Sequence, residues 1–179
     1  MTMRSTATLL VCLALAFLQG CASTRSVASD PRDPFETANR QIYAFNDRLD
    51  TAVVRPVAQV WAERVPDVVR TGVRNALGNL GDVWTAANAA LQLKGQAALE
   101  STLRVVVNST FGIYGLIDVA SETGIQKHKE DLGQTLGHWG VKPGPYLVLP
   151  VFGPATLRDA AAMPVDWQAS PGQYFPSGN

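Results

Sequence analysis

The chain has 179 residues, which fits a single domain, and 46% of them are hydrophobic. Only 17% are charged, and 15 Lys and Arg balance 15 Asp and Glu, so the formal net charge is zero. The absence of a basic excess or a basic run excludes a nucleic-acid-binding class of protein.

The N-terminus has the pattern of a lipoprotein signal. Residues 1–20 begin with a positive charge at Arg4 and continue with the apolar run Leu9–Leu18, which is shorter than the roughly 20 residues that span a bilayer. The letters LQGC at 18–21 match a bacterial lipobox. This predicts cleavage before Cys21 and lipid joined to its sulfur and its new amine. The alternative is an ordinary secretion signal followed by a chance cysteine.

A flexible tether is predicted after the signal, because residues 21–32 are small, polar and turn-rich. Ala22 is not the Asp that commonly retains lipoproteins at the inner membrane, so we expect the outer membrane. Cys12 lies in the predicted signal and Cys21 in the lipobox, and no disulfide framework is therefore possible in the domain.

Helical patterns follow from residue 35 to residue 107. Apolar residues at spacings of three and four predict a first helix, and by default their stripe faces a core; they are Phe35, Ala38, Ile42, Phe45 and Leu49. Arg55-Pro56 and Val65-Pro66 predict two further helix starts, the second helix ending near Gly78 and Gly81. Two more helices are predicted at 82–93 and 96–107.

The segment 102–120 is the most apolar part of the chain after the signal. Three polar residues interrupt it: Arg104, Asn108 and Asp118. A charge at the centre of a bilayer costs at least about 2.5 kcal/mol, so we do not interpret the segment as a spanning helix. It either lies in an interface or is buried in protein.

The segment 131–159 combines five glycines and four prolines with many apolar residues. So much Gly and Pro excludes one long helix, and so much apolar surface excludes a free solvated loop. The segment must lie against protein or lipid in an irregular shape. It is therefore either a buried, irregular core loop or a segment that faces lipid.

Motifs for catalysis are absent from the sequence. There is no G-x-S-x-G nucleophile elbow, no H-E-x-x-H and no phosphate-binding glycine loop. The two histidines and the single cysteine outside the predicted signal are too few for a typical metal site. We therefore expect a protein that is not an enzyme and that holds no cofactor or metal.

Several short motifs occur in one order between residues 33 and 159. They are DPFE at 33–36, NR at 39–40, FN at 45–46, VRP at 54–56, NST at 108–110, GI at 112–113, GLIDVA at 115–120, LGQTLG at 132–137, GV at 140–141, GPY at 144–146 and LRD at 157–159. With these motifs the chain closely resembles the MlaA family of outer-membrane lipoproteins, also called VacJ.

The resemblance implies an all-α fold, with a single ring-like helical domain at residues 33–163 that lies in the membrane interface. The Gly- and Pro-rich irregular segment then lies near the C-terminus, and Pro164, Pro171 and Pro176 predict a tail at 164–179 with little further helix. Family members continue past Arg158-Asp159 with another helical segment. We therefore interpret this chain as a truncated member or a fragment, which predicts an incomplete ring.

The function implied by the resemblance is transport of phospholipid. The lipid-anchored protein, on the periplasmic face of the outer membrane beside a trimeric porin, takes mislocalised phospholipids from the outer leaflet through an amphipathic channel. It passes them to a periplasmic lipid carrier protein of the Mla pathway. The alternatives are a structural lipoprotein that only braces a porin and an envelope phospholipase.

The resemblance also supplies candidate channel residues, and the pair Phe45-Asn46 is expected to help set the leaflet to which the channel opens. The full candidate set is Phe45, Asn46, Gly112, Tyr114, Trp139, Gly144, Tyr146 and Phe152.

Overall fold

The computed structural model describes residues 33–170, so the predicted signal, Cys21 and the predicted tether lie outside the described residues. The elements are, in chain order, α2 (Glu36–Leu49), η2 (Asp50–Val54), α3 (Arg55–Arg64), α4 (Asp67–Leu91), α5 (Gly95–Thr110), α6 (Val119–Glu122), α7 (Leu132–His138), β1 (Tyr146–Leu149), β2 (Gly153–Thr156) and α8 (Leu157–Ala169). Helices dominate, which confirms the predicted class. The predicted ring-like shape stays a prediction.

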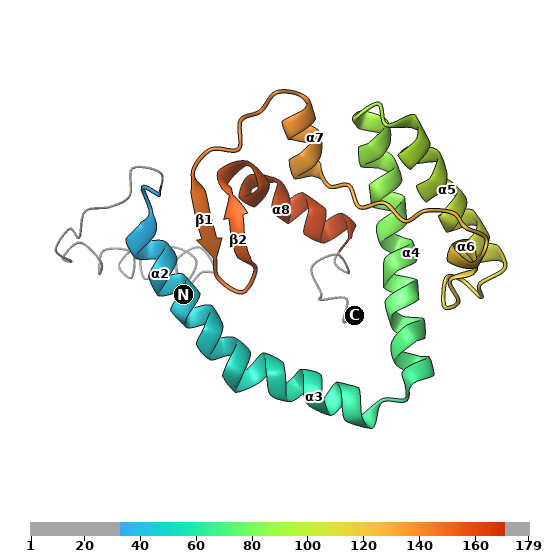
Figure 1. Cartoon of the computed structure of the whole chain (residues 1–179), viewed down its shortest axis with the longest axis horizontal. Helices are drawn as coiled ribbons and strands as arrows, with labels where there is room; N and C mark the ends of the chain where they lie inside the picture. Colours follow the sequence, from blue (N-terminus) through green and yellow to red (C-terminus); the bar gives the residue numbers. More distant parts are fainter. Residues whose placement is uncertain (1–32, 171–179) are drawn as a thin grey trace, which may run out of the picture. The chain divides into compact units, whose positions relative to one another are not determined.

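The first three helical elements follow one another without a break (Figure 1). Pro56 lies in the first turn of α3, as the Arg55-Pro56 pattern predicts, and a π-helical stretch, η2, joins α3 to α2. The predicted core stripe on α2 is wrong: Phe35 and Phe45 are exposed, whereas Asn39 is buried. All residues of α3 are exposed, so protein in the described range gives this helix no cover.

Helix α4 is one continuous helix of 25 residues, where the sequence predicts two. A glycine in a helix interior destabilises the helix by about 1 kcal/mol relative to an alanine. Packing contacts along the length of a helix can outweigh this cost. Here α4 packs along α5, and Gly81 is buried on α4. Gly78 and Gly81 therefore lie inside the helix and do not end it.

The segment predicted to be irregular contains a β-hairpin. Strands β1 and β2 pair antiparallel, with Val148 opposite Pro154. Proline is tolerated there because β2 is an edge strand that needs no donor on its outer side. Helix α2 docks on the hairpin through Asn39, which donates from Nδ2 to the Tyr146 carbonyl (3.3 Å) and accepts at Oδ1 from the Val148 N–H (2.8 Å).

Helix α8 continues through Pro164 to Ala169, so the predicted boundary between residues 163 and 164 falls inside it. An interior proline costs about 3 kcal/mol, and contacts beyond it offset this cost. Asp166 is buried, and its Oδ1 accepts from Trp84 Nε1 (2.7 Å) on α4 and from the Leu132 N–H (2.8 Å) on α7. Tertiary hydrogen bonds thus hold the second half of α8.

The burial pattern is the reverse of that in an ordinary soluble domain. Among the described residues the buried hydrophobic side chains are only Ala89, Ala97, Ala120, Val148 and Ala162. Buried polar side chains are more numerous: Asn39, Asn79, Asp82, Thr85, Asn88, Gln92, Ser101, Arg104, Asn108, Glu130, Thr135, Asp166 and Ser170. The helices are therefore held together largely by polar contacts.

Arg104 on α5 is the largest fully buried side chain in the described range, with 1% exposure. Its guanidinium donates to Asp82 Oδ2 on α4 (3.2 Å) and to both carboxylate oxygens of Asp118 (2.9 Å each). It also donates to Ser121 Oγ and to the Ile125 carbonyl. Lys127 adds a second cation at 3.0 Å from Asp82, so two positive groups face two carboxylates.

Asp118 caps α6 and connects this network to α5. Its Oδ1 accepts from the Ser121 N–H (3.2 Å) and from Asn108 Nδ2 (3.1 Å). Partial burial acts to raise the pKa of Asp118, but the bonds from Ser121 and Asn108 and the charge of Arg104 outweigh it and lower the pKa to about 2.

We predict that Arg104→Met strongly destabilises the domain. Removing one partner of a buried ion pair costs about 3–5 kcal/mol, because the other charge stays buried and uncompensated. Arg40→Met is the matched control, since Arg40 forms an exposed pair with Glu36 that is worth at most about 1 kcal/mol. Chemical denaturation in mild detergent, followed by circular dichroism, measures both. Equal effects of the two substitutions would contradict the role given to Arg104.

We predict that Asp118→Asn removes a pH-dependent part of the stability. The folded-state pKa of about 2 lies below the ordinary 3.8, so the charged form stabilises the fold above pH 3.8 and this contribution disappears as the pH falls toward 2. The difference in unfolding midpoint between wild type and variant should shrink over that interval. Burial raises the pKa of Asp166, so its titration changes the stability with pH in the opposite direction. Asp166 is present in both the wild type and the variant, so its contribution cancels in the difference. A difference that stays constant with pH would refute the assignment.

Candidate functional site

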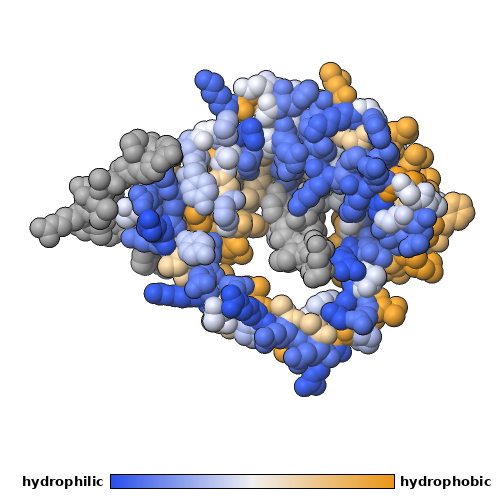
Figure 2. All heavy atoms as spheres, viewed as in Figure 1, coloured by the Kyte–Doolittle hydropathy of each residue, from blue (hydrophilic) through white to orange (hydrophobic). Residues whose placement is uncertain are grey.

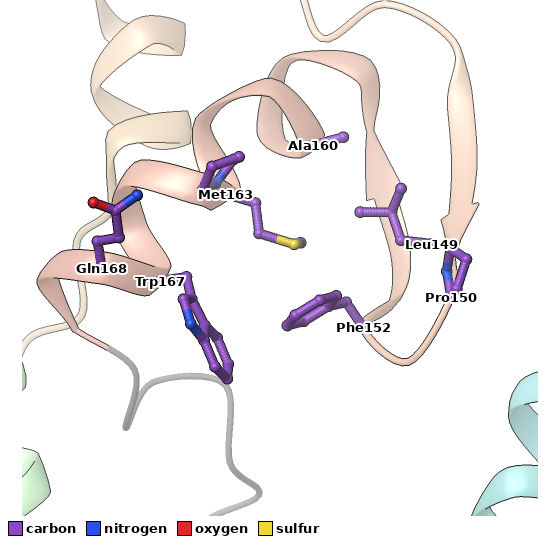
Figure 3. Close-up of a pocket in the computed structure, with 8 residues that line it drawn as sticks. Leu149, Pro150, Phe152, Ala160, Met163, Trp167 and Gln168 are labelled. Carbon is purple, nitrogen blue, oxygen red and sulfur yellow. The ribbon is translucent and has the colours of Figure 1, made fainter. Parts of the chain in front are cut away.

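A pocket of about 470 Å³ lies between the β-hairpin and α8 (Figure 3). It is lined by Leu149, Pro150, Phe152, Ala160, Met163, Pro164, Trp167 and Gln168, of which only Gln168 is polar. Its volume falls in the range of about 300–1,000 Å³ that is usual for small-molecule sites. Walls of this kind suit an alkyl chain and offer no charged group to a substrate.

Two aromatic rings of the pocket wall contact each other. The Phe152 and Trp167 rings have centroids 5.5 Å apart at an interplanar angle of 81°, an edge-to-face arrangement (Figure 3). Such a pair contributes about 0.5–1.5 kcal/mol beyond the area that it buries. It joins the turn of the hairpin to the C-terminal half of α8.

Asn46 fixes the turn that carries Phe152. Its Nδ2 donates to the Leu149 carbonyl (2.9 Å), and its Oδ1 accepts from the Val151 N–H (2.8 Å). Val151 has a φ of 72°, which is unusual for a β-branched residue and needs such support. Asn46 and Asn39 lie seven residues apart on the same face of α2, so both amides reach the hairpin.

Other candidate residues surround the hairpin without lining the pocket. Tyr146 begins β1 and is partly exposed, and Phe45 next to Asn46 is exposed. Gly144 precedes β1 with a φ of 70°, and a Cβ there would lie 3.0 Å from Leu157 Cβ. A side chain at position 144 would therefore meet both backbone strain and a close contact.

The remaining three candidates lie on other elements. Trp139, at the end of α7, donates from Nε1 to the Leu91 carbonyl (3.1 Å). Gly112 and Tyr114 lie in the turn after α5, where Asn75 and Asn79 of α4 bond to neighbouring residues. Of the eight candidate channel residues, Phe152 alone lines the pocket, and Asn46 supports it.

Sequence reasoning missed Met163 and Trp167 as site residues. The signal was present, because Ala160, Met163, Pro164 and Trp167 follow helical spacing and so share one face of α8. Pro164 concealed the pattern, since an interior proline normally ends a helix.

A second site is the exposed apolar surface itself. Val57, Val60 and Trp61 on α3 are 46–63% exposed, and burying each such side chain would gain about 1.5–3 kcal/mol. Figure 2 shows hydrophobic atoms gathered along the edge over α5 and α6 as well. Apolar patches of this extent mark contact with a membrane or another protein. No helix in the range 33–170 combines the length and hydropathy needed to cross a bilayer.

The described residues contain no group of three His, Cys, Asp or Glu side chains placed to hold a metal ion. The pocket walls carry no titratable side chain. The arrangement can bind and guide an apolar molecule, with no general base or nucleophile at the pocket.

Three comparisons relate the chain to known proteins. The family model for MlaA lipoprotein matches residues 31–178. An uncharacterised protein of Rickettsia typhi is 42% identical over 127 residues, which cover 71% of this chain and 51% of the relative. The intermembrane phospholipid transport system lipoprotein MlaA of Escherichia coli K12 is 38% identical over 151 residues, which cover 82% of this chain and 60% of that protein.

A solved structure, from work on the structural basis for maintenance of bacterial outer membrane lipid asymmetry, superimposes with a TM-score of 0.68. It is 36% identical, and the match covers 76% of this chain and 70% of that chain. The chain thus spans about half the length of the Rickettsia relative.

We predict that Asn46→Ala loosens the hairpin turn. The substitution leaves the Val151 N–H and the Leu149 carbonyl without their partner, which costs about 1–3 kcal/mol if they stay shielded from water. Amide hydrogen exchange at Val151 should become faster. Gln41→Ala, at an exposed position of the same helix, is the control and should leave that exchange rate unchanged. Unchanged exchange in Asn46→Ala would mean that the turn holds itself.

Proposed function

The chain belongs to the MlaA lipoprotein family, and from that premise we propose that it acts in intermembrane phospholipid transport that maintains outer-membrane lipid asymmetry. In this proposal the protein is anchored by lipid on Cys21 at the periplasmic face of the outer membrane. It removes mislocalised phospholipids from the outer leaflet through an amphipathic path. A periplasmic carrier receives them, and a trimeric porin holds the protein in place.

The reversed burial pattern carries the proposal. Polar side chains fill the interior, and large apolar side chains such as Val57 and Trp61 lie exposed. In hydrocarbon this arrangement is favourable, because hydrogen bonds and close packing drive helix association there and apolar side chains can face lipid. An aqueous setting would leave that apolar surface exposed to water.

The pocket supports the proposal that phospholipid follows an amphipathic path through the protein. Stripping two acyl chains of about 15 methylenes each into water costs on the order of 24 kcal/mol, at ~0.8 kcal/mol per methylene. A transporter lowers this cost by offering apolar walls along the route. The walls formed by Leu149, Met163 and Trp167 have this character, and they need no reacting group.

The two alternative functions receive less support. The relatives with named functions are components of a transport system, and the pocket holds no nucleophile, which disfavours a phospholipase. A purely structural brace for a porin would not need a shaped apolar pocket beside the hairpin.

We predict that Met163→Trp impairs transport by filling the pocket. Val165→Trp is the matched control, because it adds the same ring to an exposed position of the same helix outside the pocket. Each variant is expressed in cells that lack their own MlaA protein, and phospholipid in the outer leaflet is measured at equal protein level. Surface phospholipid should stay high with Met163→Trp and fall with the control and the wild type.

Three outcomes would count against the proposal in different ways. If the wild-type chain is membrane-bound but does not lower surface phospholipid, it does not act as a transporter. If Met163→Trp works as well as Val165→Trp, the lipid does not use the pocket. If labelled phospholipid yields hydrolysis products with the pure protein, the phospholipase alternative is correct.

A further inference from the structure

Helix α8 has two faces with different surroundings. Met163, Pro164 and Trp167 line the pocket, and Figure 3 shows Met163 extending from the helix toward the hairpin. Ala162 and Asp166 lie on a second face and are buried, with 2% and 3% exposure. Successive residues of a helix are turned by about 100° around its axis, so the neighbours Asp166 and Trp167 face different surroundings.

The first turn of α8 is held closely against α7. A Cβ at Gly133 would lie 2.6 Å from Asp159 Oδ1, and a Cβ at Gly137 would lie 2.5 Å from Arg158 Nη1. Both glycines lie on one face of α7, because they are four residues apart. The Arg158 N–H also donates to the Pro143 carbonyl (3.1 Å). All of these contacts act on the first three residues of α8.

Pro164 separates the second half of α8 from this well-held start. A proline has no N–H, so the Ala160 carbonyl receives no helical hydrogen bond from position 164. Helices commonly kink at such a position. The direction of the turn that follows Pro164 therefore depends on contacts outside the helix.

Asp166 supplies contacts of this kind. Its Oδ1 accepts from Trp84 Nε1 on α4 (2.7 Å) and from the Leu132 N–H on α7 (2.8 Å). One carboxylate oxygen thus joins three helices. Two donors that converge on one acceptor restrict its position, because hydrogen bonds weaken steeply as distance and angle depart from their optimum.

Trp167 transmits the placement of Asp166 to the pocket. Its ring packs edge-to-face against Phe152, with the centroids 5.5 Å apart. This arrangement requires a particular placement of one ring relative to the other. The hairpin turn carries Phe152, whereas the backbone beside Asp166 carries Trp167. A shift of the second half of α8 would therefore change both the ring pair and the shape of the pocket.

We propose that Asp166 is a positioning residue for lipid transport, which holds Trp167 in the pocket wall through its bonds to Trp84 and Leu132. The inference rests on the proposed function of the pocket in guiding phospholipid. The competing explanation is that Asp166 serves stability alone. Stability alone does not require these bonds, because exchanging hydrogen-bonded partners for apolar groups of the same shape can be nearly neutral.

The test observes the Trp167 ring directly, by fluorine-19 NMR of the full chain in mild detergent with 5-fluorotryptophan in place of tryptophan. The chain has four tryptophans, and Trp167→Phe identifies the Trp167 resonance by its loss. Phe152→Leu gives the resonance of that ring without its aromatic neighbour. The two test variants are Asp166→Leu, which removes the acceptor, and Trp84→Phe, which removes one donor and keeps an aromatic ring.

Trp139→Phe is the matched control for Trp84→Phe. Trp139 Nε1 also forms a tertiary hydrogen bond, to the Leu91 carbonyl (3.1 Å), but this residue does not line the pocket or contact Asp166. Thermal unfolding followed by circular dichroism measures the loss of stability in every variant. If Asp166→Leu does not fold, Trp84→Phe decides the question.

The expected result is that Asp166→Leu and Trp84→Phe move the Trp167 resonance toward its position in Phe152→Leu, whereas Trp139→Phe leaves it unchanged. A Trp167 resonance that stays in place in Trp84→Phe would overturn the inference. A resonance that moves equally in Trp84→Phe and Trp139→Phe would also overturn it, because it would then report only general loosening of the fold.

A second measurement connects this position to transport. Trp84→Phe is expressed in cells that lack their own MlaA protein, and it should leave more phospholipid in the outer leaflet than the wild type does at equal protein level. Transport at the wild-type level despite a moved resonance would overturn the role in transport. If the resonance moves as expected but the wild type itself does not lower surface phospholipid, the proposed function fails and Asp166 still positions Trp167.

Discussion

The structure depends on the buried guanidinium of Arg104. A charge in a protein interior must be paired and fully hydrogen-bonded, and five donor contacts to Asp82, Asp118, Ser121 and Ile125 meet this demand. These contacts draw α4, α5, α6 and the following loop around one point. Because ion pairs and hydrogen bonds hold these helices together, the apolar side chains on their outer faces remain free for other contacts.

The same logic extends through the interior. Thr135 Oγ1 donates to Asn88 Oδ1 (2.7 Å) and accepts from Gln92 Nε2 (3.0 Å), which joins α7 to the C-terminal part of α4. Where the surroundings are apolar, hydrophobic burial gives helices little reason to associate, whereas hydrogen bonds are stronger in a low dielectric. An interior of small and polar residues is therefore the arrangement that stays folded against lipid.

The sequence predicted the elements that local chemistry determines. The start of α3 at Arg55-Pro56 and the helical class were correct, because a proline fixes the first turn and periodicity reports helices. The long α4 and the passage of α8 through Pro164 were not predictable, since distant contacts outweigh local propensity there.

The candidate site was predicted only in part. Phe152 and Asn46 were predicted as channel residues; Phe152 lines the apolar pocket and Asn46 supports its turn, while their role in a channel stays a prediction. The partners of Arg104 were not predictable. The sequence shows that burying this charge in an apolar segment would cost free energy, but it does not show which carboxylates offset that cost. The supporting role of Asn46 was equally hidden, since it depends on a turn about 100 residues away in the chain.

The asparagines of α2 have one more consequence. A two-stranded hairpin presents unpaired backbone groups along each outer edge, and such an edge can recruit a strand from another molecule. Asn39 occupies the Tyr146 carbonyl and the Val148 N–H on the outer edge of β1 with its own amide. Helix α2 therefore stands in for a third strand, and it closes a route to aggregation in a chain that exposes much apolar surface.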